Sequence, residues 1–216
     1  MEITAEKIMQ QLSAGTQVAG VIAVFGEEGY YKDKIAAALP RAVFGDAAPE
    51  DREITVFERD TDIKEISAAV NTYPFFSGRS LVIIKDEKLW GGKDGGEKRK
   101  QQQEELAELL SDVPEHCQVL LLGEKIDKRG KLYKSLLKTA AMVECKSLKS
   151  YQLKPWLDEQ AALRGCRFDY EASQTIMEYL SVTDNAPLLL LEQEIEKLSV
   201  YAGERKIWLK FRALRC

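Results

Sequence analysis

The stretch Gly20-Val21-Ile22-Ala23-Val24-Phe25-Gly26 is a continuous apolar run, rich in β-branched residues, that ends at a glycine. A strand with apolar side chains on both faces is typical of a parallel sheet that helices cover on both sides. Four more short runs follow, separated by segments with helical spacing, and they are Ile54–Phe57, Leu81–Ile84, Val119–Leu122 and Met142–Glu144. The pattern predicts an α/β domain over residues 1–147, with a parallel sheet and flanking helices.

One predicted helix lies between the second and third of these strands. The segment Asp60-Thr61-Asp62 offers side-chain oxygens that can cap a helix N-terminus, and Pro74 is expected to stop the helix. Apolar residues recur near helical spacing between these two signals, at Ile63, Ile66, Val70 and Tyr73. The glycine-and-charge stretch 91–100 follows the third strand and predicts a loop, because it can bury almost nothing.

From Leu148 onward the strand pattern gives way to three helical periods. We therefore expect a small three-helix second domain over residues 148–203, with Gly165 and Thr183–Asn185 at helix ends. The basic, apolar tail 204–216 is interpreted as a truncated or aberrant segment. The apolar positions of the three helices are Leu153, Trp156, Leu157 and Leu163; Ala172, Ile176, Tyr179 and Leu180; and Leu188, Leu191, Ile195 and Leu198.

Composition excludes several function classes. The 216 residues include 31 basic and 35 acidic side chains, a formal net charge of -4, so no global positive field would hold the chain on DNA. A single histidine, His116, argues against a metal site and against histidine-based triads, and we expect it on a solvated loop. Four cysteines without CxxC spacing, and no apolar stretch near the roughly 18–20 residues of a membrane span, predict a cytoplasmic protein with reduced thiols.

The glycine that ends the first run invites comparison with the phosphate-binding loop, whose pattern is GxxxxGK[ST]. The stretch Gly26–Asp33 keeps the first glycine and Lys32, but Tyr31 stands at the second glycine and Asp33 at the metal-binding hydroxyl. The pair Glu27-Glu28 adds two negative charges. Like charges about 4 Å apart repel by roughly 4 kcal/mol at an effective dielectric constant near 20. We expect no ATP binding here, and we predict no catalytic residue, cofactor or metal.

A second ATPase hallmark has a near match after the third run. There, Lys85 precedes Asp86 and Glu87, and this insertion moves Asp86 toward the other face of an extended strand. A solvated charged turn is the simpler interpretation, because charged residues at strand ends are ordinary. An active ATPase that uses Lys32 and Asp86 is the alternative.

Four blocks of sequence, each weak alone, together resemble the delta subunit of bacterial DNA polymerase III. They stand in the family's order along most of the chain, and they are Val24–Tyr30, Pro74–Ile83, Glu124–Lys134 and Leu190–Gly203. The resemblance implies an AAA+-like fold with a degenerate phosphate loop, followed by a helical lid domain. It also implies an accessory, noncatalytic clamp-loader subunit that binds the sliding clamp and opens its ring for loading onto primed DNA.

The resemblance also implies partners. These are the beta sliding clamp and the tau/gamma and delta prime subunits of the loader, with DNA reached only through the complex and no membrane contact. Members of the family carry a third, helical collar domain that assembles the loader, and this sequence lacks it. Clamp contact is therefore expected of this chain, whereas assembly into the loader is left open.

By the same resemblance, the clamp-binding element is a hydrophobic pair at the end of the helix before the third strand, which falls on Phe75 and Phe76. Pro74 halts the helix and leaves both aromatic residues on a short connector. Tyr73 and Arg79 are predicted as flanking contacts. Two alternatives stay open: both rings could be core residues of a loop that folds back on the sheet, or the chain could be a structural adaptor that never touches the clamp.

The stretch Lys125–Lys138 is dense in basic residues. Such a helix could meet phosphates, but Leu132, Leu136 and Leu137 form an apolar face that is expected to pack inward. We therefore interpret its lysines as a solvated outer face.

Overall fold

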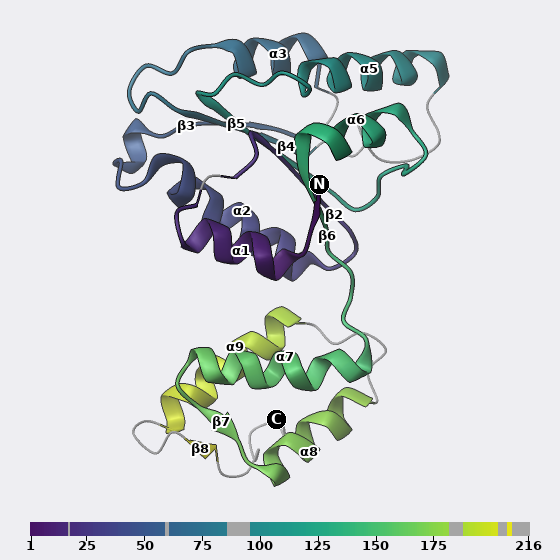
Figure 1. Cartoon of the computed structure of the whole chain (residues 1–216). Coiled ribbons are helices and arrows are strands. Elements are labelled where there is room, and N and C mark those ends of the chain that lie inside the picture. The colour runs from purple at the N-terminus through teal and green to yellow at the C-terminus, as the bar shows by residue number, and fades with distance from the viewer. Residues whose placement is uncertain (17, 59–60, 86–95, 182–187, 203–206, 209–216) are drawn as a thin grey trace. The chain divides into compact units, whose positions relative to one another are not determined.

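The computed structural model describes residues 1–16, 18–58, 61–85, 96–181, 188–202 and 207–208. The chain divides into two compact units, Met1–Lys146 and Ser147–Cys216. The first unit contains a six-stranded parallel sheet in the order β1-β6-β2-β5-β4-β3 (Figure 1). Its strands are β1 (Glu2–Ile3), β2 (Val21–Phe25), β3 (Glu53–Phe57), β4 (Ser80–Ile84), β5 (Cys117–Gly123) and β6 (Ala140–Glu144).

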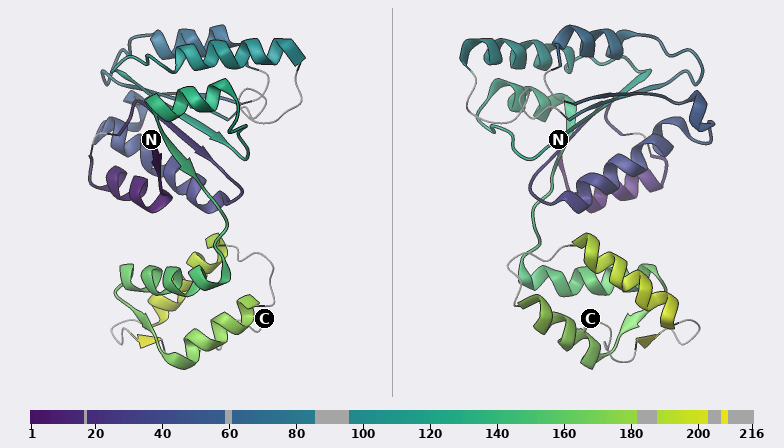
Figure 2. Two further views of the ribbon diagram at one scale, coloured as in Figure 1. Left: turned by 45° about the vertical axis from the view of Figure 1, so that its right-hand side comes forward. Right: turned by 180° about the vertical axis from the view of Figure 1, so that it is seen from behind.

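Helices cover both faces of this sheet. Helices α1 (Ala5–Ser13) and α2 (Gly29–Phe44) lie on one face, and α3 (Ile63–Asn71), α5 (Gly96–Leu109) and α6 (Lys131–Thr139) lie on the other (Figures 1 and 2). A short 3-10 helix, Pro49–Asp51, precedes β3. The expectation of an α/β parallel sheet with flanking helices is confirmed. Strand β1 was not predicted, because two residues are too few to show a pattern.

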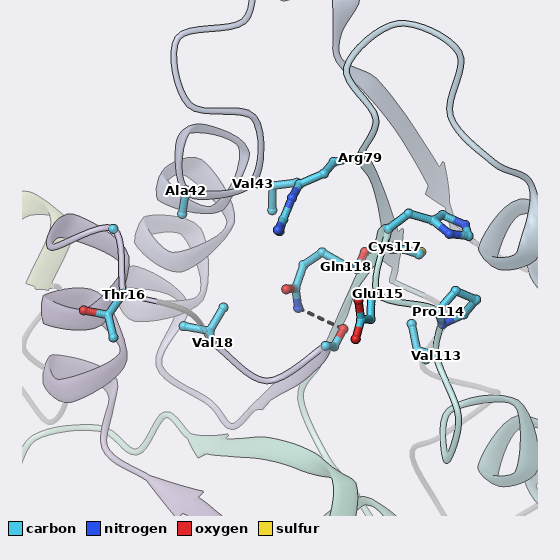
Figure 3. Close-up of a pocket in the computed structure, with 13 residues that line it drawn as sticks. Thr16, Val18, Ala42, Val43, Arg79, Val113, Pro114, Glu115, Cys117 and Gln118 are labelled. Carbon is cyan, nitrogen blue, oxygen red and sulfur yellow. Dashed lines mark hydrogen bonds between the residues drawn. The ribbon is translucent and has the colours of Figure 1, made fainter.

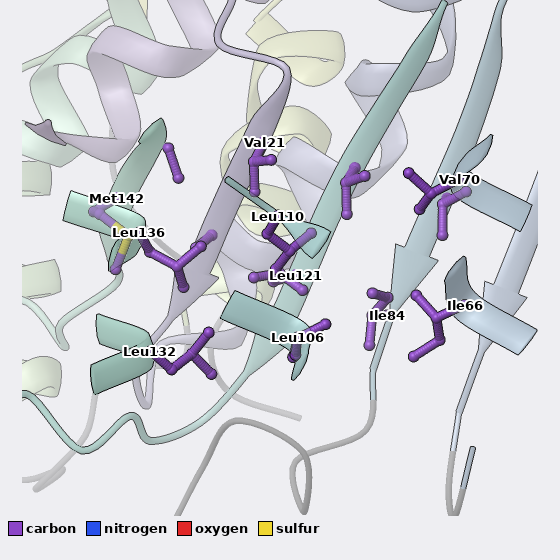
Figure 4. Close-up of a cluster of buried hydrophobic side chains, with 14 of the residues drawn as sticks. Val21, Ile66, Val70, Ile84, Leu106, Leu110, Leu121, Leu132, Leu136 and Met142 are labelled. Atoms are coloured by element: carbon purple, nitrogen blue, oxygen red, sulfur yellow. The ribbon is translucent and has the colours of Figure 1, made fainter. Parts of the chain in front are cut away.

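One core cluster of this unit lies between the sheet and helices α3, α5 and α6, and Ile8, Ile35 and Leu39 of α1 and α2 are buried as well. Alternate side chains of β2 and β5, among them Val21 and Leu121, lie in this cluster beside leucines of α5 and α6 (Figure 4). Strand β2 lies inside the sheet, between β5 and β6, and helices cover both faces there, so its five residues are all buried. This burial explains why the run around β2 is apolar without alternation. The helix residues in this cluster include Ile66, Val70, Leu106, Leu132 and Leu136, and Leu110 directly follows α5.

Strand β3 corrects one expectation, since it is not buried on both faces. It is the last strand in the sheet order, and among the described residues its partner is β4. Ile54 is 38% exposed and Val56 is 45% exposed, whereas Phe57 packs partly against the core. Helix α2 packs mainly against α1, and the strands that it contacts most are β4 and β5 rather than β3.

Helix α3 begins as predicted and ends earlier. The Asp62 carboxylate caps it by accepting a hydrogen bond from the Lys64 backbone N–H at 3.0 Å. The helix ends at Asn71, and Thr72 is already extended, so Tyr73 is not part of the buried face as expected but is 71% exposed. The predicted 91–100 loop is wrong in part, because residues 96–100 begin α5, while residues 91–95 lie outside the described residues.

The second unit contains the three expected helices, α7 (Ser150–Leu163), α8 (Tyr170–Ser181) and α9 (Leu188–Ala202). The expected absence of strands is wrong, because β7 (Arg167–Phe168) pairs in parallel with β8 (Ile207–Trp208). Leu163 is exposed rather than buried, since α7 ends there. Thr183–Asn185, and the tail except residues 207–208, fall outside the described residues. None of the helices in the described ranges is long and apolar enough to cross a membrane.

Three of the four cysteines are described, and each is a buried free thiol: Cys117, Cys145 and Cys166. Burial raises the pKa of the Cys117 thiol, and it raises that of Cys145 to about 12. A thiol that keeps its proton at neutral pH is a poor nucleophile, so these two cysteines have a structural rather than a reactive environment.

Candidate functional site

The loop after β2 is the place where a phosphate-binding loop would lie. Gly26 has a φ of +130°, and a Cβ atom built on it would lie 2.0 Å from the carbonyl oxygen of Cys145. Its N–H donates to the Glu124 carbonyl at 3.0 Å, and the N–H of Glu28 donates to the Cys145 carbonyl at 3.1 Å. The glycine is therefore required for close packing of this loop against the end of β6.

The anion-binding features of this loop are already used within the chain. The Glu28 carboxylate caps helix α2 by accepting from the Tyr30 N–H at 3.0 Å, where a phosphate would otherwise meet the helix N-terminus. The Lys32 ammonium donates to the Gly26 carbonyl at 2.8 Å. Asp33 is exposed on helix α2, beyond its first turn. This arrangement presents negative charge where a triphosphate would have to bind.

Metal chemistry finds no support in the described part of the chain. No group of three histidine, cysteine or acidic side chains there is placed to hold a metal ion. Asp86 lies outside the described residues. The preceding residue, Lys85, faces the Glu58 carboxylate at 3.8 Å.

Residues 73–79, between α3 and β4, form what we call the aromatic turn. Pro74 is buried, while Phe75 is 90% exposed and Phe76 is 70% exposed. The two rings contact each other edge to face, with centroids 5.7 Å apart. The alternative that both rings belong to the core is therefore wrong. Two adjacent exposed phenylalanines form the kind of apolar protrusion that marks an interaction surface.

The backbone of the aromatic turn is held at several points. One oxygen of the Glu53 carboxylate, at the start of β3, accepts hydrogen bonds from the backbone N–H groups of both Phe75 and Phe76. The Ser77 hydroxyl donates to the Arg79 carbonyl at 2.8 Å, and Gly78 adopts a left-handed φ of +66°. Sequence reasoning missed Glu53, because no local pattern connects it to a turn 22 residues downstream.

The two predicted flanking residues lie at the base of the turn. The ring of Tyr73 lies beside that of His116, with centroids 5.1 Å apart, so His116 is half-buried rather than solvated as expected. Arg79 is exposed, and with His116 it lines a pocket of about 480 Å³ at the amino ends of β2, β4 and β5. Figure 3 shows Arg79 and Gln118 extending into this pocket, where Gln118 donates to the Gly20 carbonyl at 2.9 Å.

The aromatic turn and the degenerate loop lie at opposite ends of the parallel strands. The turn leads into the amino end of β4, whereas Gly26 follows the carboxyl end of β2. Because all the strands are parallel, residues at these two positions cannot form one site. The structure therefore brings Phe75, Phe76, Tyr73 and Arg79 together and separates them from Lys32 and Asp33.

Three basic residues before and at the start of α6 lie beside acidic side chains. Lys128 donates to both Glu144 oxygens at 2.8 Å, and Lys131 pairs with Glu104 at 2.7 Å. Burial would raise the pKa of the Glu144 carboxyl, but hydrogen bonds from Lys128 and Lys146 outweigh it, so the pKa is lowered. Leu132 and Leu136 are buried beneath these charges. These pairs support the interpretation of a solvated outer face rather than a phosphate-binding surface.

Comparison with known proteins identifies the family. The sequence profile of the family described as DNA polymerase III, delta subunit, matches residues 25–146, over half of the chain. The chain belongs to this family. The resemblance seen in four sequence blocks is thereby confirmed, and the matched range of this delta-family chain includes both the degenerate loop and the aromatic turn.

Individual relatives agree with the profile. The DNA polymerase III subunit delta of Bacillus subtilis (strain 168) is 28% identical over 193 residues, which cover 88% of this chain and 54% of the relative. The solved structure of the Bacillus subtilis DNA clamp loader delta protein matches with a TM-score of 0.73 at 25% identity, covering 94% of this chain and 59% of that one. This delta-family chain therefore spans a little over half the length of either relative.

Proposed function

We propose that this chain binds a sliding clamp through the aromatic turn and opens the ring for loading onto primed DNA, without hydrolysing ATP. The observation that carries the proposal is the exposure of Phe75 and Phe76 on a backbone held by hydrogen bonds. Membership of the delta-subunit family supports it, and so does the solved clamp loader delta protein with the same fold.

In this mechanism, burial of the two exposed rings supplies free energy for binding the clamp. Each phenylalanine that passes from water into a partner's apolar pocket contributes roughly 1.5–3 kcal/mol, so the pair supplies about 3–6 kcal/mol. A ligand shifts a conformational equilibrium only by its differential affinity for the two states. Opening therefore requires that the chain fit the open clamp interface better than the closed one.

Clamp opening is tested with a bacterial sliding clamp that carries a donor and an acceptor fluorophore on opposite sides of one subunit interface. Addition of this chain is expected to lower energy transfer in a saturable way, because the open interface becomes more populated. Binding without any change in transfer would support a clamp-binding role and contradict opening. The absence of binding would favour a structural adaptor that packs only against the tau/gamma and delta prime subunits.

ATP binding separates this function from an active ATPase that uses Lys32 and Asp86. Repulsion of roughly 4 kcal/mol from the loop carboxylates weakens a micromolar site about a thousandfold, into the millimolar range. Titration with a fluorescent ATP analogue is therefore expected to show no saturation in the micromolar range, for the natural chain and for Lys32→Ala alike. Micromolar binding that Lys32→Ala abolishes, and that the control Lys64→Ala preserves, would favour the enzyme.

The remaining partners are proposed by the same family membership. Contact with the tau/gamma and delta prime subunits, and with DNA through the assembled complex, belongs to the whole delta subunit. The ion pairs of Lys128 and Lys131 with acidic residues are consistent with DNA being reached only through partners.

A further inference from the structure

A carboxylate outside the aromatic turn holds the backbone at both aromatic residues. Glu53 is the first residue of the edge strand β3, and one of its oxygens accepts from two consecutive N–H groups, those of Phe75 and Phe76. The bond to Phe76 has an N to O distance of 3.0 Å. Nothing in the family profile match or in the names of the relatives assigns a role to this glutamate.

Two N–H groups that converge on one oxygen restrict the backbone between them. Hydrogen bonds to an ionised carboxylate are shorter and roughly twice as strong as those between neutral groups. The turn is also tied to the rest of the unit at its two ends, because the Thr72 N–H donates to Ala68 and the Ser80 N–H donates to His116. Phe75 and Phe76 lie between these ends, and Glu53 is the side chain that holds their own amides.

We infer that Glu53 is a positioning residue for partner binding: its carboxylate fixes the backbone of Phe75 and Phe76 so that both rings point outward before the partner arrives. The inference rests on the proposed clamp-binding function. Fixing a backbone in advance removes a conformational entropy cost that binding would otherwise bear, and this raises affinity without any new contact.

The competing interpretation is that Glu53 merely stabilises the end of the sheet. A structural role of that kind would lower the stability of the first unit and leave the exchange of the turn amides and the clamp affinity unchanged in the folded protein. Removal of a positioning residue would instead make the backbone of the turn less constrained. Amide exchange at Phe75 and Phe76 distinguishes the two, because it can be measured with no partner present.

The experiment uses the full chain labelled with ¹⁵N-phenylalanine, which gives signals from only seven residues. Glu53→Ala removes the acceptor. Glu53→Gln keeps a carbonyl oxygen in its place and tests rescue by a neutral acceptor. Glu50→Ala removes an exposed carboxylate close by in the sequence and serves as the matched control. Phe25, in the centre of the sheet, reports whether the fold is intact.

In Glu53→Ala, amide exchange at Phe75 and Phe76 is expected to rise at least about tenfold, with exchange at Phe25 unchanged. Affinity for the purified sliding clamp is expected to fall about tenfold, and this corresponds to about 1.4 kcal/mol. In Glu53→Gln, both the rise in amide exchange and the fall in clamp affinity should be smaller. Glu50→Ala should show neither change. Slow exchange retained in Glu53→Ala would overturn the inference. Faster exchange with full clamp affinity would overturn it too, because the turn would then need no positioning.

These outcomes separate the inference from the function on which it rests. If the natural chain fails to bind the clamp, the proposed function is wrong, and the exchange rates alone then decide whether Glu53 fixes the turn. If the natural chain binds the clamp but Glu53→Ala keeps slow exchange at Phe75 and Phe76, the clamp-binding function stands and the positioning role of Glu53 is wrong.

Discussion

Replacement of both Phe75 and Phe76 by alanine is expected to weaken binding to the sliding clamp by about 100-fold or more. The estimate follows from burial of two phenylalanine rings at roughly 1.5–3 kcal/mol each, since every 1.4 kcal/mol corresponds to a factor of about ten. Surface plasmon resonance with immobilised clamp measures the change. Residues at the centre of an interface commonly carry most of its binding energy, so the loss should appear mainly as faster dissociation.

The double variant should fold normally, because it removes side chains that are 90% and 70% exposed and bury little in the free chain. Its melting temperature is therefore expected to match that of the natural chain. Tyr151→Ala provides the matched control, since it removes a 73% exposed aromatic ring from the second unit and should leave clamp binding intact. Undiminished binding by the double variant, with its fold intact, would exclude the aromatic turn as the contact.

Gly26→Ala is expected to destabilise the first unit by at least about 3 kcal/mol. Losses of this size are caused by severe steric overlap or backbone strain. The new methyl group would lie 2.0 Å from the carbonyl oxygen of Cys145, on a backbone with a φ of +130°. The carbonyl cannot easily move away, because Glu28 donates to it and the Cys145 N–H is bonded to Phe25.

Differential scanning calorimetry measures this effect. For a domain of this size, 1 kcal/mol corresponds to roughly 2–4 °C, so the melting temperature should fall by about 6–12 °C or more. Gly29→Ala is the matched control, because a Cβ there meets no atom within 4 Å and the residue begins helix α2. Its effect should lie within about 0.5 kcal/mol. Equal melting temperatures for the two variants would show that the loop does not pack as described.

The fold could be predicted largely because the central strands are covered on both sides. All residues of Val21–Phe25 and all but Leu122 of β5 are buried, and strands buried on both faces have continuous apolar sequences. The cap at Asp62 is equally local, since a side-chain oxygen meets a backbone N–H two residues away. Strand β1 and the pair β7 and β8 have two residues each, too few for any period to appear.

Edge position and tertiary contacts could not be predicted in the same way. Ile54 and Val56 have the composition of a buried strand, and their exposure depends on where β3 falls in the sheet order. For Phe75 and Phe76, the local sequence indicates only that a proline ends the helix. Whether the rings turn inward or outward depends on Glu53, whose contact spans 22 residues of chain.

The candidate nucleotide loop depends on both local and distant contacts. Glu28 was expected to repel phosphate, and the structure gives that carboxylate a further role as the cap of α2. Lys32 keeps the residue type of a phosphate-binding loop but donates to the Gly26 carbonyl. The function of the glycine as a packing residue depends on Cys145, far away in the sequence, and could be found only in the fold.

The most direct measurement of the central claim is a photo-cross-linking experiment with benzoylphenylalanine in place of Phe75. After irradiation with a bacterial sliding clamp, mass spectrometry should locate the cross-link in an apolar pocket on the clamp, and the same group in place of Tyr151 should give none. Cross-links found only within the chain itself, or equally from both positions, would contradict the account.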